Sequence, residues 1–148
     1  MRTTLIAMAS LVVLPTTAAA ERLTVVCPVS VSGGTTTPGA TWVSVTVYGS
    51  VPGPWLKSPL ILHDIAVYSG DPKEGASLVP DDDRPLSGRL RVATWALKGE
   101  HWVGCHYRGE TNFLAMRLPA SVRSCQSQYE QLKTGVRMRR FQCEVGDA

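Results

Sequence analysis

The sequence is poor in the residues from which most catalytic and metal sites are built. It has three histidines and four cysteines, and no two of the cysteines are closer than 18 positions. Structural zinc sites use close pairs such as C-x-x-C, and redox-active dithiols use the same spacing, so neither is expected here. The sequence also lacks a nucleophile-elbow motif, a glycine-rich phosphate loop and a recognisable pair of glycosidase carboxylates. These absences predict no cofactor, no metal and no catalytic residues, and they disfavour an enzyme.

Long apolar runs are also missing, except for one at the N-terminus. Arg2 provides a positive start, Leu5–Leu14 an apolar core, and Ala18–Ala20 the small residues that a signal peptidase reads. The core is about half of the roughly 20 residues that span a bilayer, so no transmembrane segment is expected. We expect residues 1–20 to be a signal peptide cleaved before Glu21, and the mature protein to be periplasmic or secreted. Its net charge, +3 before the loss of Arg2, is too balanced to predict nucleic acid as a partner.

Cysteines behind an export signal are expected to form disulfides, because they are exported to an oxidising compartment. The four are Cys27, Cys105, Cys125 and Cys143. They allow three pairings, and their positions alone do not choose among them. Two bridges would brace residues 21–148, a length typical of one domain.

Alternation of apolar and polar residues is the main pattern of this domain, and it is typical of half-buried strands. The predicted strands are Leu23–Val31, Thr41–Tyr48, Leu60–Tyr68, Leu90–Leu97, Trp102–Tyr107, Thr111–Leu118, Cys125–Leu132 and Val136–Cys143. Turn-forming residues separate them, among them Pro80–Pro85 with its three aspartates. One helical turn is expected within Asp71–Ser77. The pattern predicts an all-β fold, a small antiparallel β-sandwich or barrel of about seven or eight strands.

Two predicted hairpins are specific enough to set a register. With Gly109-Glu110 as a two-residue loop of type II′, Cys105 pairs with Leu114 and Val103 with Met116. These four side chains then share one face with other apolar residues, as a buried face requires.

The second hairpin turns at Lys133–Gly135, where a three-residue loop with a final glycine is typical of a type I turn and a bulge. Leu132 then faces Val136, and counting back brings Cys125 level with Cys143. This favours the Cys125–Cys143 bridge. It leaves Cys27 with Cys105, and both of these residues lie at inward-facing positions.

The polar residues that most resemble a site are two histidines and an acidic cluster. His101 and His106 differ in strand parity, so they point to opposite faces of one strand. Asp81–Asp83 lacks the spaced oxygens and the glycine of a calcium loop, so a solvated loop is the expectation. A hydrolase with a composite site near His101 or His106 is the alternative that remains.

Candidate binding residues are mostly basic. Arg137, Arg139 and Arg140 gather in the last hairpin, where they form either a solvated face or a patch for an acidic partner or a membrane surface. Trp55 lies in a proline-glycine loop, as a loop anchor or a contact. An exposed tryptophan beside Arg108 or Arg117 would make a second binding face.

A series of short motifs runs along the chain: Cys27-Pro28, Tyr68–Pro72, Glu74–Asp81, Trp95–Leu97, Trp102–Gly109, Leu118-Pro119, Cys125 and Cys143. Their order resembles a bacterial family of small exported proteins of unknown function with four cysteines. The resemblance implies an envelope or secreted location and brings no catalytic residues. A weaker similarity is to periplasmic lysozyme inhibitors, which are small β-barrels.

The leading hypothesis from the sequence is a non-catalytic, disulfide-stabilised β-domain of the bacterial envelope. It would bind another protein or an envelope component, and an inhibitor or an immunity-type protein is one concrete form. The alternatives are the hydrolase near His101 or His106, and a structural envelope protein without a discrete ligand.

Overall fold

The computed structural model describes residues 21–28, 41–50, 59–133 and 135–146. The predicted signal peptide and Trp55 lie outside these ranges. The last part of the predicted strand Leu23–Val31 also lies outside them.

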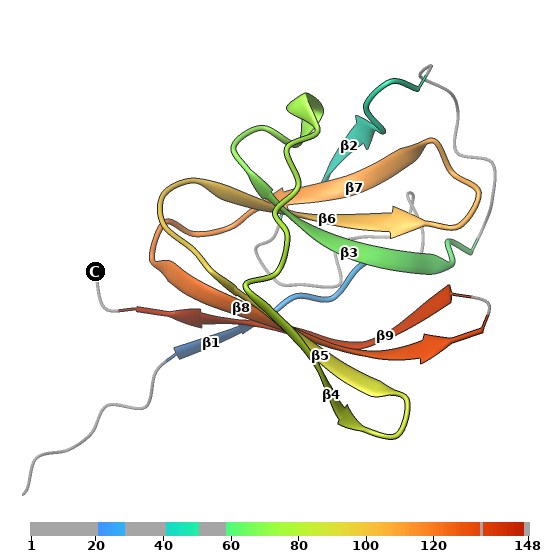
Figure 1. The fold of residues 1–148 in the computed structure, drawn as a ribbon. Coiled ribbons are helices and arrows are strands. Elements are labelled where there is room, and N and C mark those ends of the chain that lie inside the picture. Colours follow the sequence, from blue (N-terminus) through green and yellow to red (C-terminus); the bar gives the residue numbers. More distant parts are fainter. Residues whose placement is uncertain (1–20, 29–40, 51–58, 134, 147–148) are drawn as a thin grey trace, which may run out of the picture.

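The described residues form an all-β sandwich of two antiparallel sheets, which confirms the predicted fold class (Figure 1). It contains nine strands, one or two more than predicted. In the order of the sheet, the first sheet consists of β1 (Glu21–Thr24), β9 (Gly135–Val145), β8 (Val122–Leu132), β5 (Leu90–Ala96) and β4 (Asp82–Ser87). The second consists of β2 (Val43–Thr46), β7 (Asn112–Arg117), β6 (His101–Tyr107) and β3 (Leu62–Ser69). The expected helical turn is a 3₁₀ turn, η1 (Pro72–Glu74), whose first turn is capped by Asp71.

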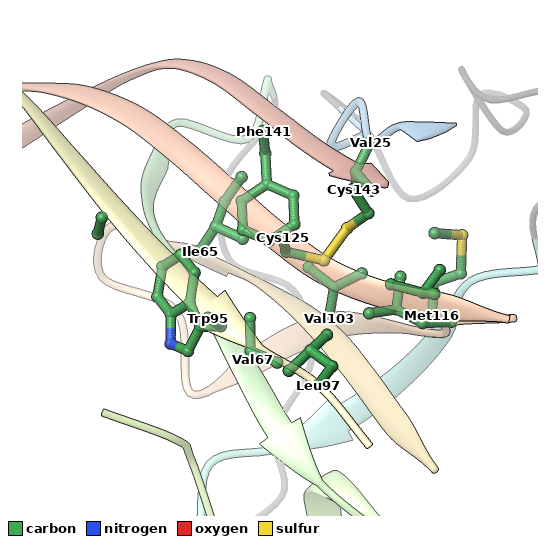
Figure 2. Close-up of a cluster of buried hydrophobic side chains, with 13 residues drawn as sticks. Val25, Ile65, Val67, Trp95, Leu97, Val103, Met116, Cys125, Phe141 and Cys143 are labelled. Atoms are coloured by element: carbon green, nitrogen blue, oxygen red, sulfur yellow. A yellow bond between two sulfur atoms is a disulfide. The ribbon is translucent and has the colours of Figure 1, made fainter. Parts of the chain in front are cut away.

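The main core lies between the two sheets (Figure 2). The inward positions of the strands supply it, as the alternating pattern predicts. Trp95 of β5 and Phe141 of β9 pack with their ring centroids 5.9 Å apart. Val67 and Val103 face them from the four-stranded sheet, and both are fully buried. The indole N–H of Trp95 donates to the backbone of Leu78, so its one polar group is satisfied.

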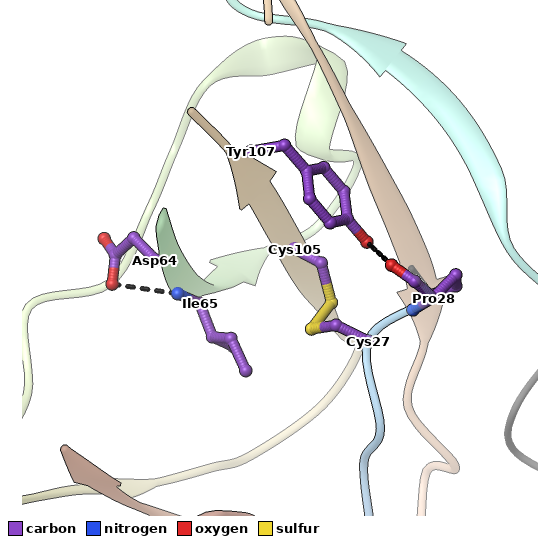
Figure 3. The surroundings of a disulfide bond; sticks show 6 residues. All are labelled: Cys27, Pro28, Asp64, Ile65, Cys105 and Tyr107. Carbon is purple, nitrogen blue, oxygen red and sulfur yellow. Dashed lines mark hydrogen bonds between the residues drawn. A yellow bond between two sulfur atoms is a disulfide. The ribbon is translucent and has the colours of Figure 1, made fainter. Parts of the chain in front are cut away.

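Two disulfides brace this core, with the pairing that the hairpin register favoured. Cys125 and Cys143 join neighbouring strands of the five-stranded sheet, with Cα atoms 4.0 Å apart. Cys27 and Cys105 tie the segment after β1 to β6, which belongs to the other sheet (Figure 3). Their loops span 18 and 78 positions. Loop entropy predicts contributions of about 3 and about 4.5 kcal/mol.

The first hairpin has the predicted register but a different turn. Cys105 pairs with Leu114 and Val103 with Met116, as expected. The N–H of Glu110 donates to the carbonyl of Tyr107, so Gly109 is the third residue of the turn rather than its first central residue. Its φ of 74° is positive, which is why glycine is needed there.

The second hairpin has the predicted disulfide but not the predicted turn. Leu132 pairs with Gly135 rather than with Val136, so the register near the turn is one residue off the prediction. The register shifts at a bulge between Gln128 and Tyr129. This shift offsets the one-residue difference at the turn, so Cys125 still pairs with Cys143.

One strand was missed. The segment Pro80–Pro85 was predicted to be a solvated loop, but β4 begins at Asp82 and runs through Pro85 at the edge of the five-stranded sheet. All of its residues are exposed. An edge strand pairs on one side only, so a proline that lacks an N–H is tolerated there. The missing apolar alternation is therefore typical of an edge strand.

Candidate functional site

The three arginines of the last hairpin lie together on the outer face of the five-stranded sheet. Simple alternation would turn Arg139 towards the core and Met138 towards solvent. The bulge in β9 prevents this, because Gln128 pairs with Arg140 while Tyr129 pairs with Met138. Met138 therefore packs against the core, and Arg139 and Arg140 are both exposed. An extra residue in one strand re-aims side chains in this way.

Two of these arginines share one carboxylate. Arg139 Nη2 lies 2.5 Å from Glu130 Oε1, and Arg137 Nη1 lies 3.7 Å from Glu130 Oε2. The hydrogen bond from Arg139 is the main cause that lowers the pKa of Glu130. Arg137, Arg139 and Glu130 all lie on the outer face, where the one negative charge of Glu130 balances only one of the two positive charges. The group remains net positive.

Next to Arg140 the same face is hollowed. This outer hollow has a volume of about 550 Å³, and polar side chains on neighbouring strands line it. Gln126 pairs with Thr94 on one side and with Gln142 on the other, which makes a row across three strands. Gln142 Nε2 donates to Thr24 Oγ1 over 3.1 Å, so the row continues onto β1. The row offers both amide donors and amide acceptors to a partner.

The basic and the acidic residues that line the outer hollow differ in their internal partners. Arg22 and Arg140 line it, and neither forms an ion pair within the part of the chain that the structure describes. Asp81 accepts from the N–H of Ala96 at 2.6 Å, and Glu144 accepts from a serine hydroxyl. The acids thus have internal partners while the guanidinium groups face solvent. A surface of this kind suits a carboxylate of another molecule, which a guanidinium binds with paired hydrogen bonds.

The other predicted binding residues do not join this surface. Arg108 is exposed at the end of β6, in the other sheet, where its N–H donates to the carbonyl of Ile61. Trp55 lies outside the described residues. Trp102 is partly buried, and its indole donates to Glu100. No exposed tryptophan therefore stands beside Arg108 among the residues described.

The sequence reasoning missed Arg22 and the glutamine row. Arg22 is far from the hairpin in the sequence and reaches it only because β1 pairs with β9. Gln126 and Gln142 could have been predicted from the sequence, since each is adjacent to a disulfide cysteine. An outward position next to an inward cysteine on each strand of one hairpin predicts a shared outer face.

The histidines have structural roles. His101 is buried, and its Nε2 lies 2.9 Å from the carbonyl and 3.1 Å from the N–H of Lys98, so the ring holds the loop before β6. His106 stacks on Phe113 at 4.4 Å and hydrogen-bonds Tyr68 Oη. Burial lowers the pKa of His106 to about 4. The two histidines lie on opposite faces of β6, as predicted, so they do not form one site together.

Metal chemistry finds no support in the described ranges. They hold no group of three or more histidine, cysteine or acidic residues that could bind an ion. Nor does any helix within them have the length and hydropathy to cross a membrane.

Comparison with known proteins gives one family. No curated protein and no solved structure matches the chain. The model of the Type VI secretion system Tli immunity protein family matches residues 57–144, which is more than half of the chain. The match covers the hairpin with the three arginines and leaves out Arg22. It agrees with the resemblance to small bacterial envelope proteins and takes the place of the weaker similarity to lysozyme inhibitors. This chain belongs to the Tli immunity protein family of the Type VI secretion system.

Proposed function

We propose that this protein is a periplasmic immunity protein, which binds a Type VI effector toxin and neutralises it without catalysis. Membership of the Tli immunity family carries the proposal. The two disulfides support the location, because they persist in an oxidising compartment such as the periplasm. The predicted signal peptide at residues 1–20 would supply the route of export.

The outer face of the five-stranded sheet is the surface that we propose for the effector. It brings together the exposed Arg137, Arg139 and Arg140 with the outer hollow and its second free guanidinium, Arg22. This positively charged surface is complementary to an acidic patch on the effector. Complementary charge speeds the encounter of two proteins and selects the partner.

The disulfide beneath the hollow favours tight binding. Cys125 and Cys143 line the floor of the outer hollow and join the two strands that carry most of its polar side chains. A surface held in its binding shape loses little conformational entropy when the partner docks. This rigidity suits an inhibitor, because an immunity protein protects only as long as it stays bound.

The test is whether this protein, exported to the periplasm of a bacterial host, protects that host against a Type VI effector toxin that it binds. The double variant Arg139→Glu with Arg140→Glu reverses two charges on the proposed surface. We expect it to fold, to lose protection and to raise the Kd by about a hundredfold or more. Arg117→Glu is the matched control, since Arg117 is equally exposed but pairs with Glu100 on the other sheet.

The result that would contradict the surface is full protection by the double variant with an unchanged Kd. The result that would contradict the function is an absence of binding and of protection by the wild-type protein. The two outcomes are read from different samples, so each part of the proposal can fail alone.

A further inference from the structure

The two sheets have four edge strands, and three of them have features that oppose pairing with another chain. The open side of β3 is covered by Ala76–Leu78, which hydrogen-bonds the backbone of Val67 and Ser69. Strand β4 contains Pro85 and three charged residues. Strand β1 begins with two charged residues, a glutamate and an arginine. Covering segments, proline and charge are the usual means by which proteins keep sheet edges from pairing.

The fourth edge strand, β2, has none of these features (Figure 1). The segment Trp42–Tyr48 contains no charged residue and no proline, and it consists mainly of valine, threonine and aromatic residues, which favour strands. Two of its apolar side chains are open to solvent, since Val43 is 39% and Tyr48 77% exposed. An uncharged edge strand of this composition is a template for a further strand.

The hydrogen-bonding pattern shows which backbone groups of β2 are open. Val47 donates its N–H to the carbonyl of Thr111, and the other two valines of β2 lie at the equivalent positions opposite β7. In an antiparallel pair only every second residue bonds the neighbouring strand. The N–H and C=O groups of Ser44 and Thr46 therefore point away from β7, and no segment in the described ranges pairs with them.

We propose that β2 pairs with β2 of a second copy of this chain, antiparallel across a twofold axis that is perpendicular to the sheet. Ser44 of each copy would exchange both backbone hydrogen bonds with Thr46 of the other. Each Val45 would then lie opposite its counterpart, and Val43 opposite Val47, as cross-strand pairs of β-branched side chains. The two four-stranded sheets would become one continuous sheet.

Charge and symmetry favour a second copy over an unrelated strand. A groove of about 340 Å³ runs along β2, and among residues 44–50 and Lys73, which line it, Lys73 alone is charged. Two copies of β2 therefore meet without like charges directly opposite each other, which would oppose pairing.

Val45 already packs with Tyr68 and Phe113 on the outer face, so the valine pairs would extend this apolar cluster across the junction. The twofold axis uses both open edges at once and gives a closed dimer. The proposed effector surface lies on the other sheet and stays free, so this inference goes beyond the proposed function and does not depend on it.

The test is the mass of the mature protein in sedimentation equilibrium, at concentrations from about 10 µM to about 1 mM, because a short strand interface gives a weak dimer. We expect the mass to rise from one chain towards two. Over the same range, hydrogen exchange of the Ser44 and Thr46 amides should slow by about threefold or more, since pairing protects N–H groups that the monomer leaves open.

Two variants separate strand pairing from other contacts. Ser44→Pro removes one of the open N–H groups, and the monomer should tolerate it because this N–H has no partner in the sheet. Ser44→Lys leaves the backbone intact and places a charge at the edge. Both should keep the mass at one chain. Ser87→Lys is the matched control, because it adds the same charge at the exposed end of β4, and it should form the dimer as the wild type does.

A mass of one chain at every concentration would overturn the proposal, and so would a dimer that both Ser44 variants still form. Slower exchange of the two amides only after addition of an effector would also overturn it, because β2 would then take a strand of the effector. The mass measurement contains no effector, so its failure leaves the protection assay as a separate test of the proposed function.

Discussion

The hydroxyl of Tyr68 lies 2.7 Å from Nε2 of His106, on the outer face of the four-stranded sheet. Both rings stack against Phe113, with centroids at 5.5 and 4.4 Å. Burial lowers the pKa of His106 to about 4, so the folded protein holds this histidine neutral across most of the acidic range. A buried neutral histidine makes folding stability depend on pH.

We expect the free energy of unfolding to fall as the pH drops from about 6.5 to about 4. In this window the unfolded chain binds a proton at His106 and the folded chain does not, so acid favours the unfolded state by on the order of 3 kcal/mol in total. Asp64 acts in the opposite sense, because its raised pKa lets the folded state take up a proton first. Urea unfolding at several pH values measures the effect. His106→Gln should flatten the curve between these limits, and an equally steep curve in this variant would contradict the assignment.

The two disulfides should differ in what they contribute. Replacing Cys27 and Cys105 by alanine should cost more than replacing Cys125 and Cys143, about 4.5 against about 3 kcal/mol, because the first pair closes the longer loop. The first pair also positions Pro28, whose carbonyl accepts from the Tyr107 hydroxyl at 2.7 Å. Denaturant unfolding of both double variants gives the comparison. A larger loss for the second pair would show that local packing outweighs loop entropy.

Gly104 should tolerate no side chain. A Cβ placed there would lie 2.7 Å from Tyr68 Cε2 and 3.0 Å from the ring of Phe113. We expect Gly104→Ala to lower stability by about 1–3 kcal/mol, as overpacking of a fixed core does. The cost should shrink in a Tyr68→Leu background, where the ring edge is gone. Thermal unfolding of the four members of this double-mutant cycle measures the coupling, and a zero coupling energy would rule out the clash with Tyr68.

The sequence predicted the fold best where burial dictates the side-chain pattern. Around the cysteines of β8 and β9, buried and exposed residues alternate, and Cys125 pairs with Cys143 as the hairpin predicted. It failed at β4, because an exposed edge strand has no buried face to leave a pattern. It also failed at the turn after Leu132. The bulge that compensates there depends on how Met138 packs in three dimensions.

The candidate surface was predicted only in part, for a related reason. The three arginines stood out because they are neighbours in the chain. Arg22 and the glutamine row come together through the pairing of β1, β5, β8 and β9, which no local pattern shows.

Removing the charge of Glu130 should strengthen the effector complex. Glu130 neutralises part of the positive charge of Arg137 and Arg139, and the hydrogen bond from Arg139 holds its pKa down, so it is ionised at neutral pH. In Glu130→Gln both guanidinium groups become available to an acidic partner. We expect the association rate to rise by about two- to fivefold at low salt, and the gain to shrink as salt screens the charges.

Surface plasmon resonance with the effector immobilised, at two ionic strengths, gives these rates. Glu100→Gln is the matched control, because Glu100 pairs with Arg117 on the other sheet and its loss frees a guanidinium away from the proposed surface. It should leave the association rate unchanged. If Glu130→Gln slowed association, or if Glu100→Gln accelerated it by the same factor, the effector would be responding to the overall charge of the protein. The outer face of the five-stranded sheet would then have no special role in the encounter.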